Sequence, residues 1–469
     1  MYATTVFAIL SLALSVSAEP KPVLATGSSG PVTLPLYHAS GRPDPNAGSR
    51  AGWWLRRKSL LTRRKYARHL DATAHAHLKR DIVDFERGLA GQEVITTWER
   101  DTMYSAKLEV GTPAQTFELQ LDTGSSDMYL YSSACANCPG GPKFDYTKSS
   151  TYHAGDPSDE LQYGIGYAKG IWANDTVSIA GATVFEQTFQ ATNDTDDSYA
   201  NTTISGLIGL AWPALASVAM PLWINLMDQW DDKRFAFALA RVSLTDGTNP
   251  WEDGAAPGGV VTLGEESAEV MAGVDDSLYT GEIIYHNLTG NDYWRVDMES
   301  VNINGQVLST GKNLSAIIDT GSTLLTGPTE QVKAFYSHIP GSSPTSYEGT
   351  DGFYQFPCAN ADQLDVQLTF NGVSYPIDYY DMIFRPVTNG TPDIEDGMCF
   401  GAMFGYDFDN INWIIGDTFL KNVVSVFQYD PPAVGFATPV THRAGWYGAN
   451  KKDAGRKTQK GPHRQDNHW

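Results

Sequence analysis

The sequence has few features of a helical protein. Charged residues are only 19% of the 469, and helical periodicity is confined to short stretches, the best at 214–229 and 330–338. It is instead rich in the turn formers glycine (44) and proline (25), and 12% of its residues are aromatic. This composition is typical of strand-rich proteins with many turns. Short β-branched or aromatic segments bounded by Gly or Pro predict strands at 105–110, 116–121, 260–263 and 423–427. We therefore expect an all-β protein, and the 42% hydrophobic content allows more than one sizeable core.

Long hydrophobic runs are equally scarce. An apolar run at 6–16 ends in Val16-Ser17-Ala18, a small-residue cleavage site, and predicts a signal peptide over 1–18, although no Lys or Arg precedes it. The run is too short to span a bilayer, and no second one follows, so we expect neither a membrane anchor nor a lipid-anchor tail. The expected location is secreted and extracellular, with an acidic compartment of the secretory pathway as the alternative.

Cysteine is rare, which leaves room for two disulfides. Cys135 and Cys138 are three residues apart, and Cys358 and Cys399 lie together in the second half. Of the three possible connectivities, the one in which both disulfides are local, each within one half, is favoured. A metal site is the weaker interpretation of the C-x-x-C pattern, because no second such pair or His cluster accompanies it. Six N-x-S/T sequons support the secretory route and predict glycosylation at Asn174, Asn193, Asn201, Asn287, Asn313 and Asn389.

Charge is distributed unevenly. Residues 1–80 hold 12 Lys and Arg against 3 acidic residues, residues 81–440 hold 14 against 49, and residues 441–469 hold 7 against 2. An acidic body repels nucleic acid, so no such partner is expected. We interpret 19–80, which ends in the processing site Lys79-Arg80, as a basic pro-segment docked on the acidic body; a solvated linker is the alternative. The tail, 441–469, is predicted to be disordered.

The most informative pattern is a tetrapeptide that occurs twice. Asp-Thr-Gly-Ser stands at 122–125 and 319–322, each time after an apolar, strand-like run. Copies 197 residues apart indicate a duplicated unit, with two unrelated turns as the alternative. If the halves face each other across a pseudo-two-fold axis, Asp122 and Asp319 meet there. Carboxylates about 3 Å apart share one proton, so one can act as a general base toward water while the other supplies a proton.

The duplication extends beyond the tetrapeptides. Gly209 follows an apolar pair 87 residues after Asp122, and Gly416 follows another 97 residues after Asp319. Because glycine has no Cβ, it lets one strand pass close to the backbone of another. Motif, spacer and second strand thus recur in the same order, which predicts an N-terminal lobe over 81–270 and a C-terminal lobe over 271–440.

Residues 100–440 resemble the pepsin-like aspartic endopeptidases, in particular the secreted fungal ones. Besides the two tetrapeptides, the resemblance rests on five landmarks: 104–115, Tyr279-Thr280-Gly281, Tyr293-Trp294, Phe370-Asn371-Gly372 and 413–436. It implies an all-β, bilobal fold with two pseudo-symmetric lobes and a central cleft. It also implies a monomeric enzyme that cleaves peptide and protein substrates, uses no cofactor or metal, and is inhibited by its own pro-segment.

The resemblance assigns roles to both tetrapeptides. Asp122 and Asp319 match the catalytic pair that holds the nucleophilic water. The residues that follow them match threonines that brace the two loops, glycines whose backbone lies under the carboxylates, and serines that bond the outer carboxylate oxygens. This supporting set is Thr123, Gly124, Ser125, Thr320, Gly321 and Ser322.

The resemblance also assigns a substrate-binding flap. Tyr163, Gly164 and Ile165 match the hairpin that closes over bound peptide, and Ile204 and Leu207 match the adjoining pocket wall. Several fungal relatives place Asp where this chain has Ile165, and that Asp lets them accept Lys before the scissile bond. An apolar residue at this position predicts a preference for large apolar side chains there, because an unpaired buried ammonium is costly.

The sequence departs from the family pattern in two places and matches it in one more. Tyr129 stands where the family usually has the Trp that supports the flap tyrosine, so flap ordering is expected to differ. The short middle disulfide of the second half is absent, as in many fungal relatives. Lys65 beside Tyr66 resembles the lysine–tyrosine pair of pepsin-type pro-segments, and Lys65 is the candidate for contact with the aspartates.

The sequence thus favours the secreted zymogen of an acid-acting aspartic endopeptidase. One alternative is an inactive homologue that uses its cleft as a peptide receptor, which predicts loss of an aspartate, a threonine or the flap tyrosine. Another is a glycoside hydrolase with two carboxylates, which leaves the two identical loops unexplained.

Overall fold

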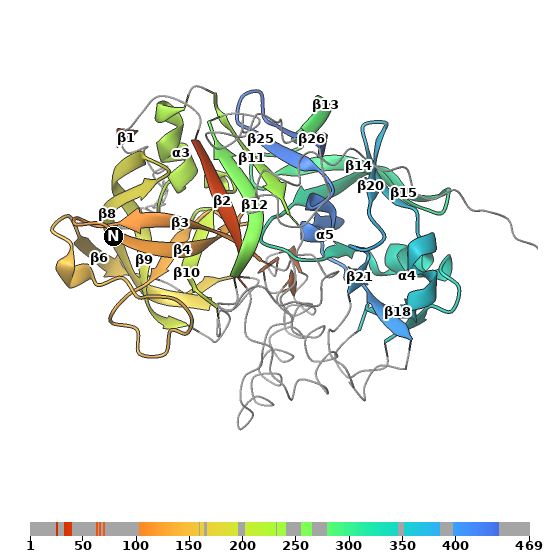
Figure 1. The fold of residues 1–469 in the computed structure, drawn as a ribbon, viewed down its shortest axis with the longest axis horizontal. Helices are drawn as coiled ribbons and strands as arrows, with labels where there is room; N and C mark the ends of the chain where they lie inside the picture. Colours follow the sequence, from red (N-terminus) through yellow and green to blue (C-terminus); the bar gives the residue numbers. More distant parts are fainter. Residues whose placement is uncertain are drawn as a thin grey trace, which may run out of the picture.

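A computed structural model shows how the chain folds (Figure 1). It describes residues 25–26, 32–39, 62–63, 65–66, 69–70, 103–158, 160–163, 167–195, 202–230, 232–240, 255–264, 279–345, 351–384 and 397–439. The predicted signal peptide, the Lys79-Arg80 processing site and the tail lie outside these residues. So does the predicted division between the lobes at residue 270.

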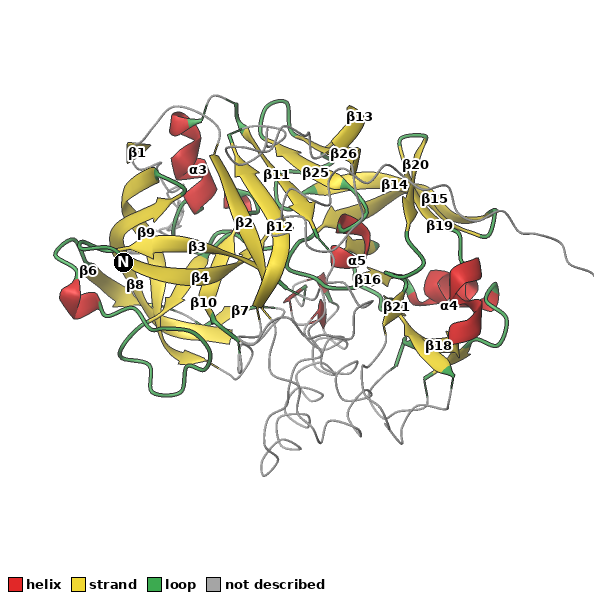
Figure 2. Ribbon diagram, in the orientation of Figure 1, coloured by secondary structure: helices red, strands yellow, loops and turns green. Residues whose placement is uncertain are grey.

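Strands account for most of the regular structure (Figure 2). In the first half they are β1 Ala25–Thr26, β2 Val32–Ala39, β3 Tyr104–Val110, β4 Gln115–Asp122, β5 Met128–Tyr131, β6 His153–Pro157, β7 Leu161–Gln162, β8 Tyr167–Ile179, β9 Ala182–Thr195, β10 Ile204–Gly209, β11 Arg234–Leu239 and β12 Ala255–Leu263. In the second half they are β13 Tyr279–Asn287, β14 Arg295–Ile303, β15 Gln306–Ile318, β16 Leu325–Gly327, β17 Ser343–Pro344, β18 Tyr354–Pro357, β19 Val366–Phe370, β20 Val373–Ile377, β21 Ile383–Phe384, β22 Met398–Gly401, β23 Met403–Gly405, β24 Trp413–Ile415, β25 Val424–Gln428 and β26 Ala433–Pro439.

Helices are short. The α-helices are α3 Leu222–Leu226, α4 Thr329–Ser337 and α5 Asp417–Leu420, and the 3₁₀ turns are η3 Tyr146–Lys148, η4 Pro213–Leu215, η5 Met227–Gln229 and η6 Cys358–Gln363. The fold is therefore the all-β, bilobal one that the sequence predicted, with one lobe on each side of the view in Figure 1.

The strands form three sheets. A 15-stranded sheet runs in the order β13-β26-β25-β11-β12-β2-β3-β4-β10-β5-β9-β8-β6, with β1 paired to β9 and β7 paired to β8 beside this path. It therefore contains strands from both halves of the sequence. A seven-stranded sheet, β20-β19-β14-β15-β24-β16-β23, and a four-stranded sheet, β17-β18-β22-β21, belong to the second half. Strand β2, from the basic N-terminal segment, lies between β12 and β3, a position that the sequence did not predict.

The duplicated unit has the same topology in each half. β10 pairs in parallel with β4 and antiparallel with β5, and β24 pairs in parallel with β15 and antiparallel with β16. In each half, a glycine at the end of β10 or directly after β24 lies close to the backbone of a neighbouring segment. A Cβ on Gly209 would lie 2.4 Å from the carbonyl carbon of Ser126, and one on Gly416 would lie 2.2 Å from the carbonyl oxygen of Ser322. The close passage predicted for these two glycines is confirmed.

The two halves also share an aromatic core. Trp223 from the first half and Trp294 from the second are buried with ring centroids 5.7 Å apart, and Phe235 stacks on Phe427 at 5.0 Å. The indole N–H of Trp294 donates to the Leu210 carbonyl at 2.9 Å. Buried aromatic pairs of this kind are worth about 0.5–1.5 kcal/mol beyond their buried area. The core therefore fixes the lobes, and the strand ends that carry the two tetrapeptides, relative to each other.

Most predicted elements are confirmed. The four predicted strands correspond to β3, β4, β12 and β25, and the helix predicted at 330–338 is α4. The helix predicted over 214–229 is wrong in extent, since only η4 and the segment from α3 to η5 are helical there. Pro221 explains the break: proline lacks an N–H and biases the preceding residue toward extended backbone, so the helix begins only after it.

Candidate active site

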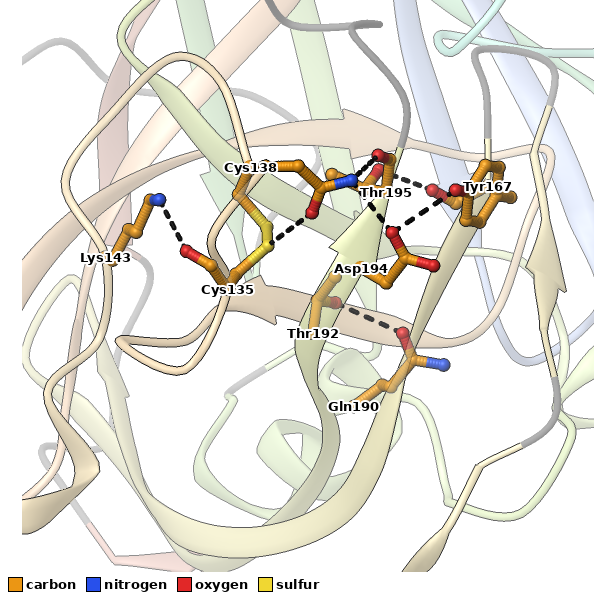
Figure 3. Close-up of a disulfide and its surroundings, with 9 residues drawn as sticks. Cys135, Cys138, Lys143, Tyr167, Gln190, Thr192, Asp194 and Thr195 are labelled. Carbon is orange, nitrogen blue, oxygen red and sulfur yellow. Dashed lines mark hydrogen bonds between the residues drawn. A yellow bond between two sulfur atoms is a disulfide. The ribbon is translucent and has the colours of Figure 1, made fainter.

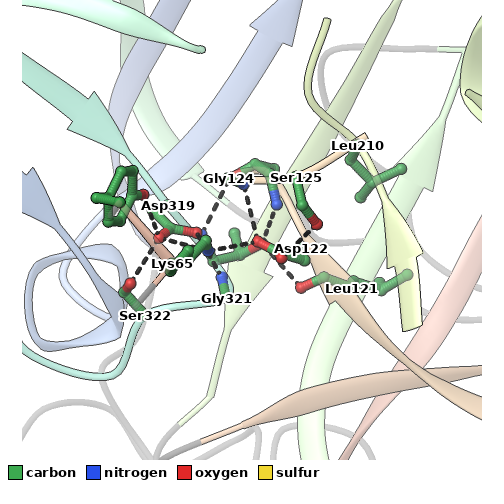
Figure 4. A network of polar contacts seen from close by, with 12 residues as sticks. Lys65, Leu121, Asp122, Gly124, Ser125, Leu210, Asp319, Gly321 and Ser322 are labelled. Carbon is green, nitrogen blue, oxygen red and sulfur yellow. Dashed lines mark hydrogen bonds and ion pairs between the residues drawn. The ribbon is translucent and has the colours of Figure 1, made fainter. Parts of the chain in front are cut away.

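The two tetrapeptides form matching loops (Figure 4). In the first, the Gly124 N–H donates to Asp122 Oδ1 at 2.8 Å, and the Ser125 hydroxyl donates to Oδ2 at 2.5 Å. In the second, the Gly321 N–H donates to Asp319 Oδ1 at 2.9 Å, and the Ser322 hydroxyl donates to Oδ2 at 2.5 Å. Each carboxylate thus accepts one backbone and one hydroxyl bond, which orient it and stabilise its ionised form.

The threonines brace the two loops against each other. Thr123 Oγ1 accepts from the Thr320 N–H at 2.9 Å and donates to the Ile318 carbonyl at 2.9 Å. Thr320 Oγ1 accepts from the Thr123 N–H at 3.1 Å and donates to the Leu121 carbonyl at 3.0 Å. Both threonines are fully buried. Because every bond crosses from one half to the other, the arrangement fixes the separation of the two aspartates.

The glycines allow the carboxylates to approach. A Cβ on Gly321 would lie 2.2 Å from Asp122 Oδ1, and a Cβ on Gly124 would lie 2.6 Å from Asp319 Oδ1. Cβ atoms are essentially never found so close to another heavy atom. The tetrapeptide therefore needs glycine at its third position for the facing carboxylate to fit.

A lysine of the basic N-terminal segment bridges the two carboxylates. Lys65 Nζ lies 2.8 Å from Asp122 Oδ1 and 2.7 Å from both carboxylate oxygens of Asp319. Its neighbour Tyr66 donates its hydroxyl to Asp319 Oδ2 at 2.7 Å. The three ionisable side chains of the bridge are nearly sealed from solvent, with exposed fractions of 5% for Lys65, 4% for Asp122 and 0% for Asp319. The contact proposed for Lys65 from the sequence is present in the structure.

The bridge makes the two aspartates unequal. Burial raises the pKa of Asp122 above its usual range. The charge of Lys65 opposes this rise, the facing charge of Asp319 adds to it, and the net shift is upward. Burial acts on Asp319 in the same direction, but Lys65, Ser322 and Tyr66 together outweigh it and lower the pKa of Asp319. Burial would lower the pKa of Lys65, yet the two carboxylates reverse this and raise it. An ionised lysine thus faces one ionised carboxylate and one that readily takes a proton.

Tyr163, the expected flap tyrosine, packs on the first lobe. Its ring lies 4.8 Å from the Tyr129 ring, in an apolar cluster that also contains Leu161, Ile204 and Leu207. Tyr129 thus packs against Tyr163 at the position where the family usually has Trp. Residues 164–166, which include Gly164 and Ile165, lie outside the described residues.

Both disulfides follow the local pairings favoured from the sequence. The sulfur atoms of Cys135 and Cys138 are 2.02 Å apart, and those of Cys358 and Cys399 are bonded across 41 residues. Cys135 and Cys138 belong to the same apolar cluster as Tyr163.

The first disulfide loop is tied to the end of β9 (Figure 3). Within the loop, Asn137 Nδ2 donates to Asp194 Oδ1 and to the Thr195 carbonyl, both at 2.8 Å. Lys143 Nζ donates to the Cys135 carbonyl at 2.7 Å. The bonds join the loop to the strand that pairs with the second arm of the flap, since β9 runs beside β8.

The sequons differ in their surroundings. Asn193 and Asn287 are exposed, whereas Asn174 is half-buried and accepts a bond from the Thr188 hydroxyl at 2.6 Å. Asn313 lies within β15, and Asn201 and Asn389 are outside the described residues. Glycosylation at the six positions stays a prediction.

The described residues contain neither a metal-binding cluster nor a membrane-spanning helix. No group of three or more His, Cys, Asp or Glu among them is placed to hold a metal ion. Nor does this part of the chain contain a helix long and apolar enough to cross a membrane.

Sequence reasoning missed the pro-segment contacts on the second lobe. The Arg63 guanidinium carbon lies 4.3 Å from the centre of the Tyr406 ring, and the Tyr66 ring lies 5.4 Å from that of Tyr293 and 5.7 Å from that of Phe408. Nothing in the sequence pairs Arg63 with a ring 343 residues away. The lysine–tyrosine pair was found only because it resembles a known pro-segment pattern.

Comparison with known proteins agrees with this geometry. Residues 103–439 match the family described as eukaryotic aspartyl protease. The chain is 33% identical to major aspartyl peptidase 1 of Cryptococcus neoformans, over 89% of this chain and 87% of that protein. It is 30% identical to an aspartic protease of Phaffia rhodozyma, over 94% and 100% of the two chains, and 31% identical to pepsin A of Sus scrofa, over 74% and 84%.

Proposed function

The chain belongs to the eukaryotic aspartyl protease family and is an aspartic peptidase, and from that premise we propose that it is the secreted zymogen of an acid-acting endopeptidase. The observation that carries the proposal is the Lys65 bridge. The family match covers residues 103–439, and Lys65 lies outside it in a basic segment. The Lys65 ammonium lies between the two facing aspartates. A substrate cannot reach these carboxylates while Lys65 and Tyr66 occupy them.

In the proposed mechanism, Asp122 and Asp319 hold a water once the pro-segment has left. The ionised carboxylate takes a proton from the water as its oxygen attacks the scissile carbonyl carbon, and the protonated carboxyl gives its proton to the carbonyl oxygen. The resulting gem-diol collapses when the carboxyl that took the proton from water gives it to the leaving nitrogen and the C–N bond breaks, while the other carboxylate takes a proton from one gem-diol hydroxyl, which restores the pair. The supporting bonds hold both carboxylates in place, and their titration belongs to the pair.

Activation follows from the charges of the pro-segment. Residues 1–80 carry 12 basic residues, and the body carries an excess of acidic ones. As the pH falls, Asp122 takes a proton first because its pKa is raised, and one of the two attractions on Lys65 weakens. Asp319 follows only below its lowered pKa. Acid therefore releases the segment in two steps, and cleavage follows after Lys79-Arg80 or slightly downstream by the enzyme itself.

The proposed specificity is for large apolar residues before the scissile bond. Ile204 and Leu207 are buried beside Tyr163, and the first-lobe wall that they form is apolar. A cleavage library scored by mass spectrometry tests this. Phe, Leu and Met are expected before the cut, and Ile165→Asp is expected to admit Lys. Enrichment of Lys by the unmodified enzyme would contradict the assignment.

Titration with a statine-type peptide inhibitor tests the function itself. The secreted full-length chain should bind no inhibitor at neutral pH, and after acid treatment it should bind one inhibitor per chain and lose all proteolysis. The mature N-terminus, read by sequencing, should lie at or just beyond residue 80. A full-length chain that is already active at neutral pH would overturn the zymogen, and activity that survives a saturating inhibitor would overturn the two-aspartate mechanism.

A further inference from the structure

The loop after β23 alternates aromatic and acidic side chains. Residues 406–409 read Tyr-Asp-Phe-Asp. Tyr406 is half-buried and Phe408 buried, whereas Asp407 and Asp409 are exposed. The loop therefore presents part of the Tyr406 ring next to two outward-facing acids, on the same lobe as Asp319.

The body itself fixes this ring in place. The Tyr406 N–H donates to the Gly327 carbonyl at 2.8 Å, and the Thr329 N–H donates to Asp407 Oδ1 at 3.1 Å. The Tyr406 ring packs edge-on against Phe408, with centroids 4.9 Å apart. None of these contacts involves the pro-segment, so the orientation of the ring does not depend on it.

The pro-segment covers this loop. Arg63 places its guanidinium carbon 4.3 Å from the centre of the Tyr406 ring, within the range of a cation–π interaction. Tyr66 packs on Phe408, and the Asp409 N–H donates to the His69 carbonyl. The segment thus uses Lys65 at the aspartates and Arg63 at Tyr406, and its departure uncovers both places.

We propose that Tyr406 is the platform of a substrate subsite for a basic side chain, which takes the place that Arg63 holds in the zymogen. The inference rests on the proposed function, because it requires a pro-segment that leaves and a peptide that enters. A guanidinium should bind better than an ammonium, since its planar group stacks on an aromatic ring and is more weakly hydrated.

An aromatic platform suits an enzyme that works in acid. A carboxylate loses its charge, and with it its attraction for a cation, as the pH falls, whereas the face of a tyrosine ring keeps its quadrupole and arginine stays protonated. The attraction between a cation and exposed charges such as those of Asp407 and Asp409 is screened by salt. A preference for arginine that is due to the Tyr406 ring should therefore persist at acid pH and in moderate salt.

The subsite lies a few residues from the scissile bond. Contacts lead from Asp319 to Tyr66, from Tyr66 to Phe408 and from Phe408 to Tyr406. An extended peptide advances about 3.3–3.6 Å per residue, so a side chain about three or four residues from the cut can reach the ring. The subsite is thus separate from the apolar pocket beside Tyr163, and the two preferences are compatible.

Paired peptides test the proposal in the mature enzyme. A positional library first identifies where Arg is enriched relative to the cut, and peptides with Arg or its uncharged isostere citrulline at that position are then compared. We expect kcat/KM for the Arg peptide to be about two- to fivefold higher, from the usual strength of an exposed cation–π contact. Tyr406→Phe should keep this ratio, and Tyr406→Leu should bring it to about one.

Control variants show whether the preference for the Arg peptide over the citrulline peptide comes from Tyr406 or from another residue. Tyr379→Leu, which removes an exposed tyrosine elsewhere on the second lobe, should leave the ratio unchanged. Asp409→Asn should also leave it unchanged. Equal cleavage of the Arg and citrulline peptides by the unmodified enzyme, or a ratio that survives Tyr406→Leu, would overturn the subsite while leaving the proposed function intact. Failure to cleave any library peptide would instead contradict the function.

Discussion

The two Asp-Thr-Gly-Ser loops are alike in sequence and bonding, yet their aspartates have different pKa values. Each carboxylate accepts one backbone and one serine bond, and each threonine bonds across the axis. Asp319 additionally accepts the Tyr66 hydroxyl and has the Lys65 ammonium at both of its oxygens. Lys65 and Tyr66, whose tyrosine ring packs on the second lobe, thus break a symmetry that the duplication established. The comparison indicates that the two loops are built alike and that contacts from outside them move the pKa values of the two aspartates in opposite directions.

The largest expected effect comes from breaking the pair itself. Asp122→Asn and Asp319→Asn should each lower kcat/KM by several orders of magnitude, because groups that act as a unit fail together. The double variant should be little worse than either single one. Peptide hydrolysis by the mature enzymes measures this, with circular dichroism as the control for folding. Losses that add up in the double variant would show that the aspartates act independently.

The next effect comes from removing the bridge. Lys65→Met in the full-length chain leaves two facing carboxylates without their counter-ion, and breaking a buried ion pair typically costs about 3–5 kcal/mol. The variant should bind a statine-type inhibitor at a higher pH than the unmodified zymogen does. Lys333→Met is the matched control, because its partner Glu330 is exposed and surface pairs contribute little. A Lys65→Met chain as latent as the original would contradict the inhibitory role.

The matching hydrogen bonds of Thr123 and Thr320 can be tested by removing each hydroxyl in turn. Thr123→Val and Thr320→Val each leave a buried N–H and a buried carbonyl without the hydroxyl partner, at a cost of about 1–3 kcal/mol for each unpaired group. We expect equal losses of stability in the mature enzyme, measured as the change in urea unfolding midpoint at unchanged m-value. A difference of more than about 1 kcal/mol between the variants would show that the loops are braced unequally.

The smallest effect should come from Tyr66→Phe, which removes a bond that only Asp319 has. The pKa of Asp319 is lowered in the zymogen, so its ion pair with Lys65 persists above the ordinary pKa and is lost as the pH falls through the lowered one. Without the tyrosine hydroxyl the pKa of Asp319 rises toward its usual range. The pH midpoint of activation, followed by inhibitor binding, should therefore shift upward by less than about one pH unit, as for one hydrogen bond. A downward shift would contradict the assigned cause.

The sequence predicted the symmetric part of this comparison better than the asymmetric part. Identical tetrapeptides, strand-like runs before them and Gly209 and Gly416 at similar spacings encode the duplicated unit locally, and the structure has it. The contact between Lys65 and the aspartates came from resemblance to a family pattern. Packing between segments far apart in the sequence left no signal, which is why the place of β2 in the sheet and the position of Arg63 over Tyr406 were not predicted.

The pH dependence of kcat/KM in the mature enzyme tests the central claim most directly, namely that two facing carboxylates act as one pair. With the pro-segment gone, one member must be ionised and the other protonated, so the profile should be bell-shaped with its optimum on the acid side and two macroscopic pKa values that belong to the pair. A plateau of activity that extends above neutral pH, or a profile with a single titration, would contradict the account.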